Sequence, residues 1–189
     1  MILIVGLGNP GQKFNKTRHN IGFFIIEKFR EINNFPEWEK SSGIHCLYSK
    51  KEIDGKGIEL IKPLLFMNNS GKVVKYVTKK HNLKSENIFV IHDDIDLPLG
   101  KIRIVQNRGA AGHKGVESII KELRTKNFIR FRIGIEPNQT KRINNTKSFV
   151  IKGFSNKEKK TVEEVAQKTI EAIETVLKEN LAEAMQKYN

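Results

Sequence analysis

The chain's 189 residues and its 38% share of hydrophobic residues fit one globular domain over residues 1–189 and exclude a disordered chain. Its single cysteine, Cys46, excludes an intramolecular disulfide and suits a reducing compartment. Lys and Arg total 34 against 21 Asp and Glu, so the net charge of +13 favours a polyanionic partner such as nucleic acid, although a solvated lysine-rich surface would give the same excess.

The start of the chain does not resemble a leader or a membrane segment. Residues 1–5 are apolar but follow no basic stretch, and Gly6 ends the run. No later run approaches the ~20 apolar residues that a membrane helix needs. We therefore expect a soluble, cytoplasmic protein with no membrane partner.

The first third of the chain predicts a strand, a helix and a hairpin. Residues 2–7 are a short apolar run that glycine interrupts, as in a buried strand. Apolar residues at helical spacing between 21 and 32 predict an amphipathic helix. Residues 44–48 and 57–61 are typical of strands, and Asp54-Gly55 between them is a hairpin signal.

The middle of the chain predicts a helix and three strands. Valines between 73 and 77 predict a helix that Asn69 or Ser70 caps. Residues 88–91 are typical of a buried strand, and a turn is expected at residues 96–98.

The two strands that follow carry basic residues on one face. Lys101 and Arg103 alternate with isoleucines in the first, and Arg130 and Arg132 alternate with apolar residues in the second. Between them, the glycine-rich loop 109–115 leads into a third helix.

The last part of the chain is predicted to be helical. An apolar stripe from residue 162 to 177 predicts a long helix, and Asn180 is expected to separate it from a short one. Residues 137–146 are the most loop-like segment and a candidate for mobility. Because strands and helices interleave, the sequence predicts the α/β class: a single domain with a mixed twisted sheet flanked by helices.

The opening Gly6-Leu7-Gly8-Asn9-Pro10-Gly11 matches the glycine pattern of dinucleotide-binding folds. Its context argues against that function, because in those folds the pattern opens a helix at the phosphate. Here a polar loop follows, and the helical spacing starts about ten residues later. Dinucleotide binding is therefore a distant alternative.

Two candidate catalytic residues follow separate strands. His19 precedes the first helix, whose positive end favours the neutral imidazole that a general base needs, although a lone histidine there can simply cap the helix. Parallel strands would bring Asn9, His19 and Asp93 together at one edge of the sheet. An aspartate orients a paired histidine but favours its cation, so which effect is larger stays open. A metal site at Asp93, Asp94 and Asp96 is the alternative.

Two further loops offer binding groups. Asn68 can donate to a carbonyl or a developing oxyanion, whereas Asn69 is explained better as a helix cap. In the run from Gly109 to Gly115, small residues would let backbone N–H groups approach a phosphate or a 3′-terminal nucleotide, although an ordinary glycine-rich loop is the alternative. No serine lies in a G-x-S-x-G motif, and no zinc-ligand spacing occurs.

Six motifs, taken in order, resemble those of bacterial peptidyl-tRNA hydrolases: G-L-G-N-P-G, T-R-H-N, F-M-N-x-S-G, H-D-D-I-D-L-P-L-G, G-H-K-G and F-R-I-G-I. The resemblance implies a monomeric enzyme that releases tRNA from peptidyl-tRNA without a metal or a cofactor. It implies that His19 is the catalytic histidine and Asp93 its orienting aspartate. The substrate contacts that the resemblance predicts lie at Asn9, Phe14, Phe66, Met67, Asn68, Gly112, His113 and Lys114.

The implied mechanism is general-base hydrolysis. His19 takes a proton from water, which attacks the ester carbonyl, while Asp93 supports the imidazole and Asn68 positions the carbonyl or the water. The basic strands would hold tRNA phosphates without reading sequence, through Lys101, Arg103, Arg130 and Arg132. The alternative is a non-catalytic RNA-binding relative, against which the presence of both His19 and Asp93 argues.

Two residues depart from the family's usual pattern. Phe14 stands where the family usually has tyrosine, so a hydroxyl is missing while ring stacking remains possible. Lys114 stands where the family usually has asparagine. Its ammonium can reach a phosphate but cannot accept a hydrogen bond, so it cannot position the peptide as the amide oxygen of an asparagine would.

Overall fold

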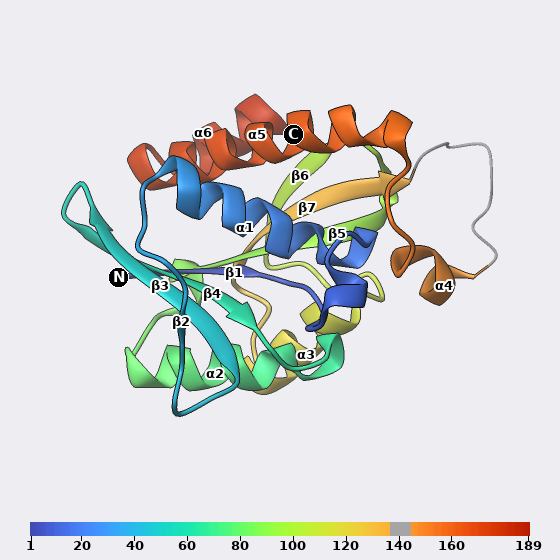
Figure 1. Cartoon of the computed structure of the whole chain (residues 1–189). Coiled ribbons are helices and arrows are strands. Elements are labelled where there is room, and N and C mark those ends of the chain that lie inside the picture. Colours follow the sequence, from blue (N-terminus) through green and yellow to red (C-terminus); the bar gives the residue numbers. More distant parts are fainter. Residues whose placement is uncertain (137–144) are drawn as a thin grey trace.

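A mixed sheet of seven strands forms the centre of the computed structural model, which describes residues 1–136 and 145–189. The strands lie in the order β2-β3-β4-β1-β5-β7-β6 (Figure 1). β1 runs parallel to β4 and β5, and β5 runs parallel to β7, whereas the pairs β2–β3, β3–β4 and β6–β7 are antiparallel. Their bounds are β1 Ile2–Gly6, β2 Glu39–Lys40, β3 Cys46–Ile53, β4 Lys56–Pro63, β5 Ile88–Pro98, β6 Ile102–Gln106 and β7 Ile129–Glu136.

Helices cover both faces of the sheet (Figure 1). One face carries α1, α5 and α6, and the other carries α2 and α3, while α4 lies at one end of the molecule beside the turn that precedes α1. The helices are α1 Ile21–Ile32, α2 Ser70–Lys80, α3 Lys114–Leu123, α4 Thr146–Val150, α5 Asn156–Lys178 and α6 Leu181–Tyr188. Short 3-10 turns span Gln12–Phe14, Arg18–Asn20, Met67–Asn69 and Ser85–Asn87.

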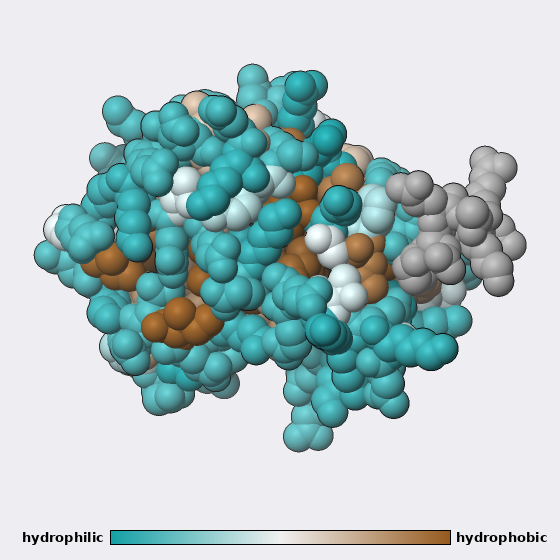
Figure 2. Space-filling model, turned by 90° about the horizontal axis from the view of Figure 1, so that it is seen from above, coloured by the Kyte–Doolittle hydropathy of each residue, from teal (hydrophilic) through white to brown (hydrophobic). Residues whose placement is uncertain are grey.

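Alternating side chains of β1 enter two hydrophobic cores. Leu3 and Val5 pack into the core beneath α2 and α3, whereas Ile4 packs into the core beneath α1 and α5. All three are fully buried, and burial of each such side chain contributes about 1.5–3 kcal/mol. On the outside, hydrophilic side chains cover most of the face seen in Figure 2, and apolar surface is confined to small patches. The packed sheet gives the loops at its carboxyl edge a rigid base.

Several predicted elements are confirmed. The fold is a single α/β domain with a mixed sheet between helices. Asp54 and Gly55 form the hairpin turn between β3 and β4, and both have a positive φ, 50° and 71°. Asn180 separates the last two helices and caps α6, since its side chain accepts from the N–H of Glu183 at 3.0 Å.

Three local predictions are wrong. β5 continues to Pro98, so residues 92–94 lie within the strand and the expected turn at residues 96–98 is absent. The strand continues beyond its polar residues because, after a register shift, it pairs with β7 again at Pro98. β3 runs from Cys46 to Ile53 rather than ending at residue 48, because its full-length pairing with β4 and not its apolar pattern sets its length.

The third wrong prediction is the cap of α2. Asn69 stands at the N-cap position, but its side chain makes no capping hydrogen bond. The preceding 3-10 turn leaves Asn69 with a ψ of 3°, not the extended backbone that a capping side chain needs. The N–H of Gly71 instead donates to the hydroxyl of Ser118 in α3, at 3.0 Å.

Two further expectations concern the loop and the membrane. Residues 137–144 of the predicted loop lie outside the described residues, and Thr146 begins α4. Among the helices of the described ranges, none combines the length and the apolar character that crossing a membrane requires.

Candidate active site

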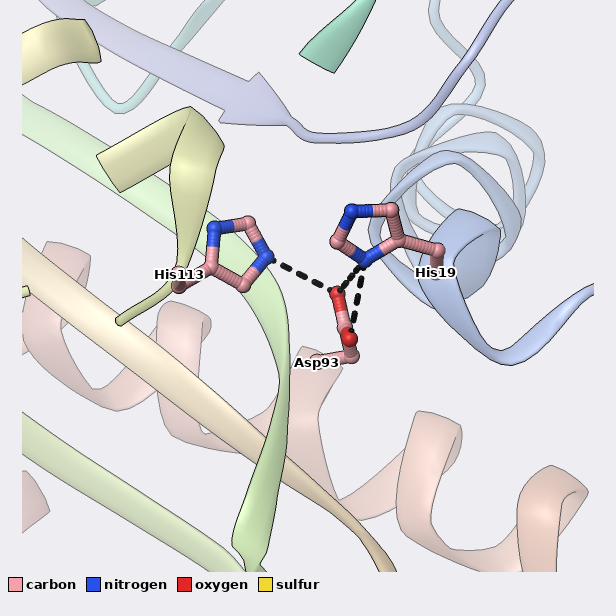
Figure 3. A group of neighbouring side chains, drawn as sticks. All are labelled: His19, Asp93 and His113. Carbon is pink, nitrogen blue, oxygen red and sulfur yellow. Dashed lines mark hydrogen bonds and ion pairs between the residues drawn. The ribbon is translucent and has the colours of Figure 1, made fainter. Parts of the chain in front are cut away.

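Three segments bring a histidine, an aspartate and a second histidine together at the carboxyl edge of the sheet (Figure 3). His19 lies in the 3-10 turn between β1 and α1. Asp93 lies on β5, and His113 is the N-cap residue of α3. Because β1 and β5 are parallel neighbours, their carboxyl ends open toward the same edge, as the sequence predicted.

The carboxylate of Asp93 accepts hydrogen bonds from both histidines. The Nδ1 of His19 lies 2.8 Å from one carboxylate oxygen and 2.9 Å from the other. The Nε2 of His113 lies 2.9 Å from the first of these oxygens. An ionised carboxylate only accepts, so each of these ring nitrogens carries a proton and donates it.

The hydrogen bonds also assign the other ring nitrogens. The Nδ1 of His113 accepts from the N–H groups of Gly115 and Val116, at 3.2 and 3.3 Å, so it carries no proton and His113 is neutral. The Nδ1–H of His19 is engaged by Asp93, which leaves its Nε2 free to act as a base.

The charge of Asp93 is held by these neighbours. Asp93 is only 2% exposed, and burial alone would raise the pKa of its carboxyl. The hydrogen bonds from His113 and His19, and the electrostatic attraction between these rings and the carboxylate, outweigh burial, so the pKa of Asp93 lies well below its usual range. Asp93 is therefore ionised in the folded protein near neutral pH.

A third histidine, His92, packs against the ring of His113. Its ring meets that of His113 edge-on, with centroids 4.6 Å apart, and its Nδ1 lies 2.7 Å from the backbone oxygen of Asp93. Complete burial, together with the nearby ring of His113 and the charge of Arg130, lowers the pKa of His92 well below its ordinary value. His92 is thus a neutral packing residue.

Asn9 is held rigidly after β1. Its side-chain oxygen accepts from the N–H of Met67 at 2.9 Å, which leaves the amide NH₂ as its available donor. Asn20 braces it, because the Asn20 side chain bonds both the N–H and the C=O of Asn9 at 2.9 Å. Met67 is buried beneath this contact, whereas Phe66 is 60% exposed and Asn68 is exposed.

A cavity of about 520 Å³ opens beside His19 and Asp93. Its walls come from the glycine-rich loop and α3 on one side and from α4 on the other. The lining residues include Gly112, His113 and Lys114, and also Thr146, Lys147, Val150 and Ile151. Lys114 is exposed and pairs with Glu117 at 2.9 Å. Phe14, which is half-buried beneath Lys13, does not line the cavity.

The predicted phosphate contacts fall into different environments. Lys101 and Arg103 are exposed on and next to β6, as expected. Arg132 is partly exposed, and its Nε donates to Asp94 at 2.6 Å.

Arg130 is not on an exposed basic face, and that expectation is wrong. It is 1% exposed, because β7 lies between β5 and β6 and the loop at Gly109 covers it. Its Nη2 donates to the backbone oxygen of Gly109 at 2.8 Å, and burial, with the nearby charge of Arg132, lowers its pKa to about 10. This burial does not support a phosphate contact.

The alternatives left open by the sequence find little support. Asp94 binds Arg132 and the N–H of Asp96, so the three aspartates form no common ligand set in the described ranges. His19, Asp93 and His113 have the spacing of metal ligands, but hydrogen bonds between them occupy the atoms concerned. A Cβ at Gly6 would meet Gly22 of α1 at 2.5 Å, so this glycine allows close packing rather than phosphate binding.

The comparisons with known proteins agree with this geometry. The sequence model of peptidyl-tRNA hydrolase matches residues 3–189. A peptidyl-tRNA hydrolase from Thermodesulfovibrio yellowstonii is 39% identical over 201 residues, which cover 100% of this chain and 99% of that protein. One from Clostridium acetobutylicum is 40% identical over 190 residues, covering 100% and 98%. The chain belongs to the peptidyl-tRNA hydrolase family.

A solved structure of a family member supports the fold as well. The crystal structure of peptidyl-tRNA hydrolase from Acinetobacter baumannii matches with a TM-score of 0.91 at 28% identity, over 100% of this chain and 94% of that one. The resemblance drawn from the six motifs is thereby confirmed, and with it an enzyme of the peptidyl-tRNA hydrolase class.

Sequence reasoning missed two roles in this family member. His113 was taken as a substrate contact, but it is also the second donor to Asp93 and the cap of α3. The signal that pointed to it was a histidine directly before a helix at the end of a glycine-rich loop. Arg18, within T-R-H-N, carries an ion pair with Glu158 of α5, and no local pattern indicates a contact across 140 residues of chain.

Proposed function

We propose that this chain hydrolyses the ester bond between the peptide and the tRNA of peptidyl-tRNA, with His19 as the general base. The observation that carries the proposal is that Asp93 holds the Nδ1–H of His19 at 2.8 Å, while His19 lines a cavity of about 520 Å³. A neutral imidazole in this tautomer has a free Nε2 to accept a proton.

The reaction needs two proton transfers. The Nε2 of His19 takes a proton from water as the water oxygen attacks the ester carbonyl, and a tetrahedral oxyanion forms. The resulting imidazolium is stabilised by the ionised carboxylate of Asp93. His19 then returns the proton to the ribose oxygen as the ester bond breaks, so the products are a peptide carboxylic acid and free tRNA.

The other contacts are assigned by their chemistry. The amide NH₂ of Asn9 and the exposed amide of Asn68 are donors for the peptide carbonyl or the oxyanion. The exposed ring of Phe66 and that of Phe14 offer stacking surfaces for the terminal nucleotide, and buried Met67 supports them. Gly112, His113 and Lys114 form the wall on the other side of the base.

Phosphate contacts come from the β6–β7 side of the molecule. Lys101 and Arg103 are exposed there, Arg132 is partly exposed beside its ion-pair partner Asp94, and a net charge of +13 favours tRNA binding as a whole. Such contacts suit an enzyme that accepts many tRNAs, because they read no bases. We further propose a cytoplasmic monomer that forms one domain over residues 1–189 and needs no cofactor.

The test is hydrolysis of N-acetyl-aminoacyl-tRNA by the wild type and His19→Ala, with unblocked aminoacyl-tRNA as the control substrate. Cleavage of the blocked substrate alone, lost in the variant, supports both the activity and the base. If the wild type binds tRNA but cleaves neither substrate, the chain is instead a non-catalytic RNA-binding relative. Lys114→Asn would then be the first variant to restore cleavage, since it reintroduces the amide usual in the family.

A further inference from the structure

The arginine that precedes His19 is a buried cation with partners far away in the sequence. Arg18 is 6% exposed. Its Nη1 donates to the backbone oxygens of Lys152, at 3.3 Å, and of Gly153, and its Nη2 donates to Glu158 at 2.7 Å. Burial alone would raise the pKa of Glu158, but hydrogen bonds from Ser155 and the charge of Arg18 keep it below its usual range. The ion pair is thus present at neutral pH.

Two aromatic rings and the backbone strengthen the same contact. The rings of Phe149 and Phe154 lie 4.6 and 4.9 Å from the guanidinium carbon of Arg18. The backbone N–H of Arg18 also donates to the oxygen of Lys152 at 3.0 Å, and Thr17 forms a β-bridge with Gly153. Residues 149–154 are therefore attached to the two residues directly before His19.

The attached segment continues from one wall of the cavity. Thr146, Lys147 and Val150 of α4, with Ile151, line the cavity that His19 also lines. α4 has five residues, too few to be stable without tertiary contacts. It lies at the end of the molecule, beside the turn that carries Arg18 and His19 (Figure 1). The placement of this wall therefore depends on the contacts of residues 149–154.

We propose that Arg18 is a positioning residue, which sets the distance between His19 and the α4 wall of the cavity. Its planar guanidinium bonds two carbonyls and a carboxylate at once, a geometry that a lysine ammonium does not reproduce. The inference rests on the proposed function, because it assigns the cavity to the substrate. Arg18 itself touches no reacting atom in this scheme.

The test compares Arg18→Lys and Glu158→Gln with the control Glu163→Gln. Glutamine at 158 has one acceptor oxygen, which can keep the capping hydrogen bond to the N–H of Ser155, so the variant loses the charge and the acceptor for the Nη2 of Arg18. Glu163 lies on the same helix and pairs with Lys28 at 2.6 Å, away from Arg18, so its variant makes the same chemical change elsewhere. Each protein is measured by amide hydrogen exchange and by steady-state cleavage of N-acetyl-aminoacyl-tRNA.

For Arg18→Lys and Glu158→Gln, we expect amide hydrogen exchange in residues 146–154 to become about 10-fold faster, while exchange in the sheet stays unchanged. KM should rise about 5-fold with kcat within about 2-fold, because binding geometry changes and the base does not. Glu163→Gln should change neither. If Arg18→Lys does not fold, Glu158→Gln alone tests whether the ion pair positions the α4 wall.

Three outcomes would overturn the inference. Unchanged exchange would show that Arg18 does not hold the segment, and faster exchange with unchanged KM would show that the wall does not contact substrate. A fall in kcat with unchanged KM would mean that Arg18 acts on His19 itself. If the wild type cleaves nothing, the proposed function fails, whereas the exchange measurement still reports on Arg18 and the wall.

Discussion

At the scale of single residues, the site is organised around one buried carboxylate. Asp93 receives hydrogen bonds from His19 and His113, and the two histidines differ in what lies on their other side. Both histidines line the cavity, but the second nitrogen of His113 is occupied by the N-terminus of α3, whereas the Nε2 of His19 has no hydrogen-bond partner among the described residues. Only His19 can therefore exchange a proton with a bound water.

Replacing Asp93 by asparagine tests its role in orienting His19 without changing the fold. In Asp93→Asn the amide can accept from His19 or donate to it, so the wrong tautomer becomes populated and the imidazolium loses its counter-charge. We expect kcat to fall by about 1000-fold or more, with the circular dichroism spectrum unchanged. Asp96→Asn, at an exposed position of the same strand, is the matched control. Comparable losses in both variants would contradict the role of Asp93.

Replacing His113 separates its two hydrogen-bonding roles. In His113→Asn the amide oxygen can still cap α3, since asparagine is a strong N-cap residue, but it is too short to reach Asp93. Thermal unfolding should show a loss of stability of about 1–3 kcal/mol, because the buried carboxylate of Asp93 loses a donor, and kcat should fall by about 10-fold because Asp93 is less firmly held. Unchanged kcat would mean that His113 serves only as a cap.

At the scale of secondary-structure elements, β6 and β7 divide their basic residues by environment. Arg103 is exposed, and Arg132 is paired with Asp94, but Arg130 is buried and holds the glycine-rich loop. The pair of strands thus combines an outer surface for phosphates with an internal support for the loop that carries His113.

The salt dependence of tRNA binding distinguishes these roles. In Arg103→Gln, one phosphate contact is lost, so the plot of log affinity against log salt should become shallower by about 1. Lys168→Gln, an exposed position on α5, should leave the slope unchanged. The measurement is a filter-binding titration at several salt concentrations. An equal change in both variants would indicate a general charge effect instead of a contact on β6.

At the scale of the whole molecule, two cores fix the sheet from both sides, and the active site lies where loops leave that rigid base. Cys46 belongs to the core under α2 and α3. Burial raises the pKa of its thiol, which disfavours the reactive thiolate.

Cys46 therefore reports on global unfolding. Native protein at pH 7 should resist alkylation by iodoacetamide, and one thiol per chain should react once denaturant has unfolded it. Mass spectrometry after quenching measures the modified fraction. Rapid modification of the native protein would show that this core opens locally. Binding of tRNA should slow the reaction only if it stabilises the folded state as a whole.

The α/β class, the hairpin at Asp54-Gly55 and the pairing of His19 with Asp93 could all be predicted from the amino-acid sequence. These follow from local signals: apolar periodicity, turn chemistry, and the rule that parallel strands direct their carboxyl ends to one edge.

The length of β5, the burial of Arg130, the second hydrogen bond to Asp93 and the contacts of Arg18 could not be predicted, and they became known from the folded chain. Each depends on which distant segment lies alongside. A basic residue alternating with isoleucines has the same local pattern whether a loop covers it, as at Arg130, or water does, as at Arg103. Burial and partner choice are set by packing between segments far apart in the chain, and local periodicity carries no record of them.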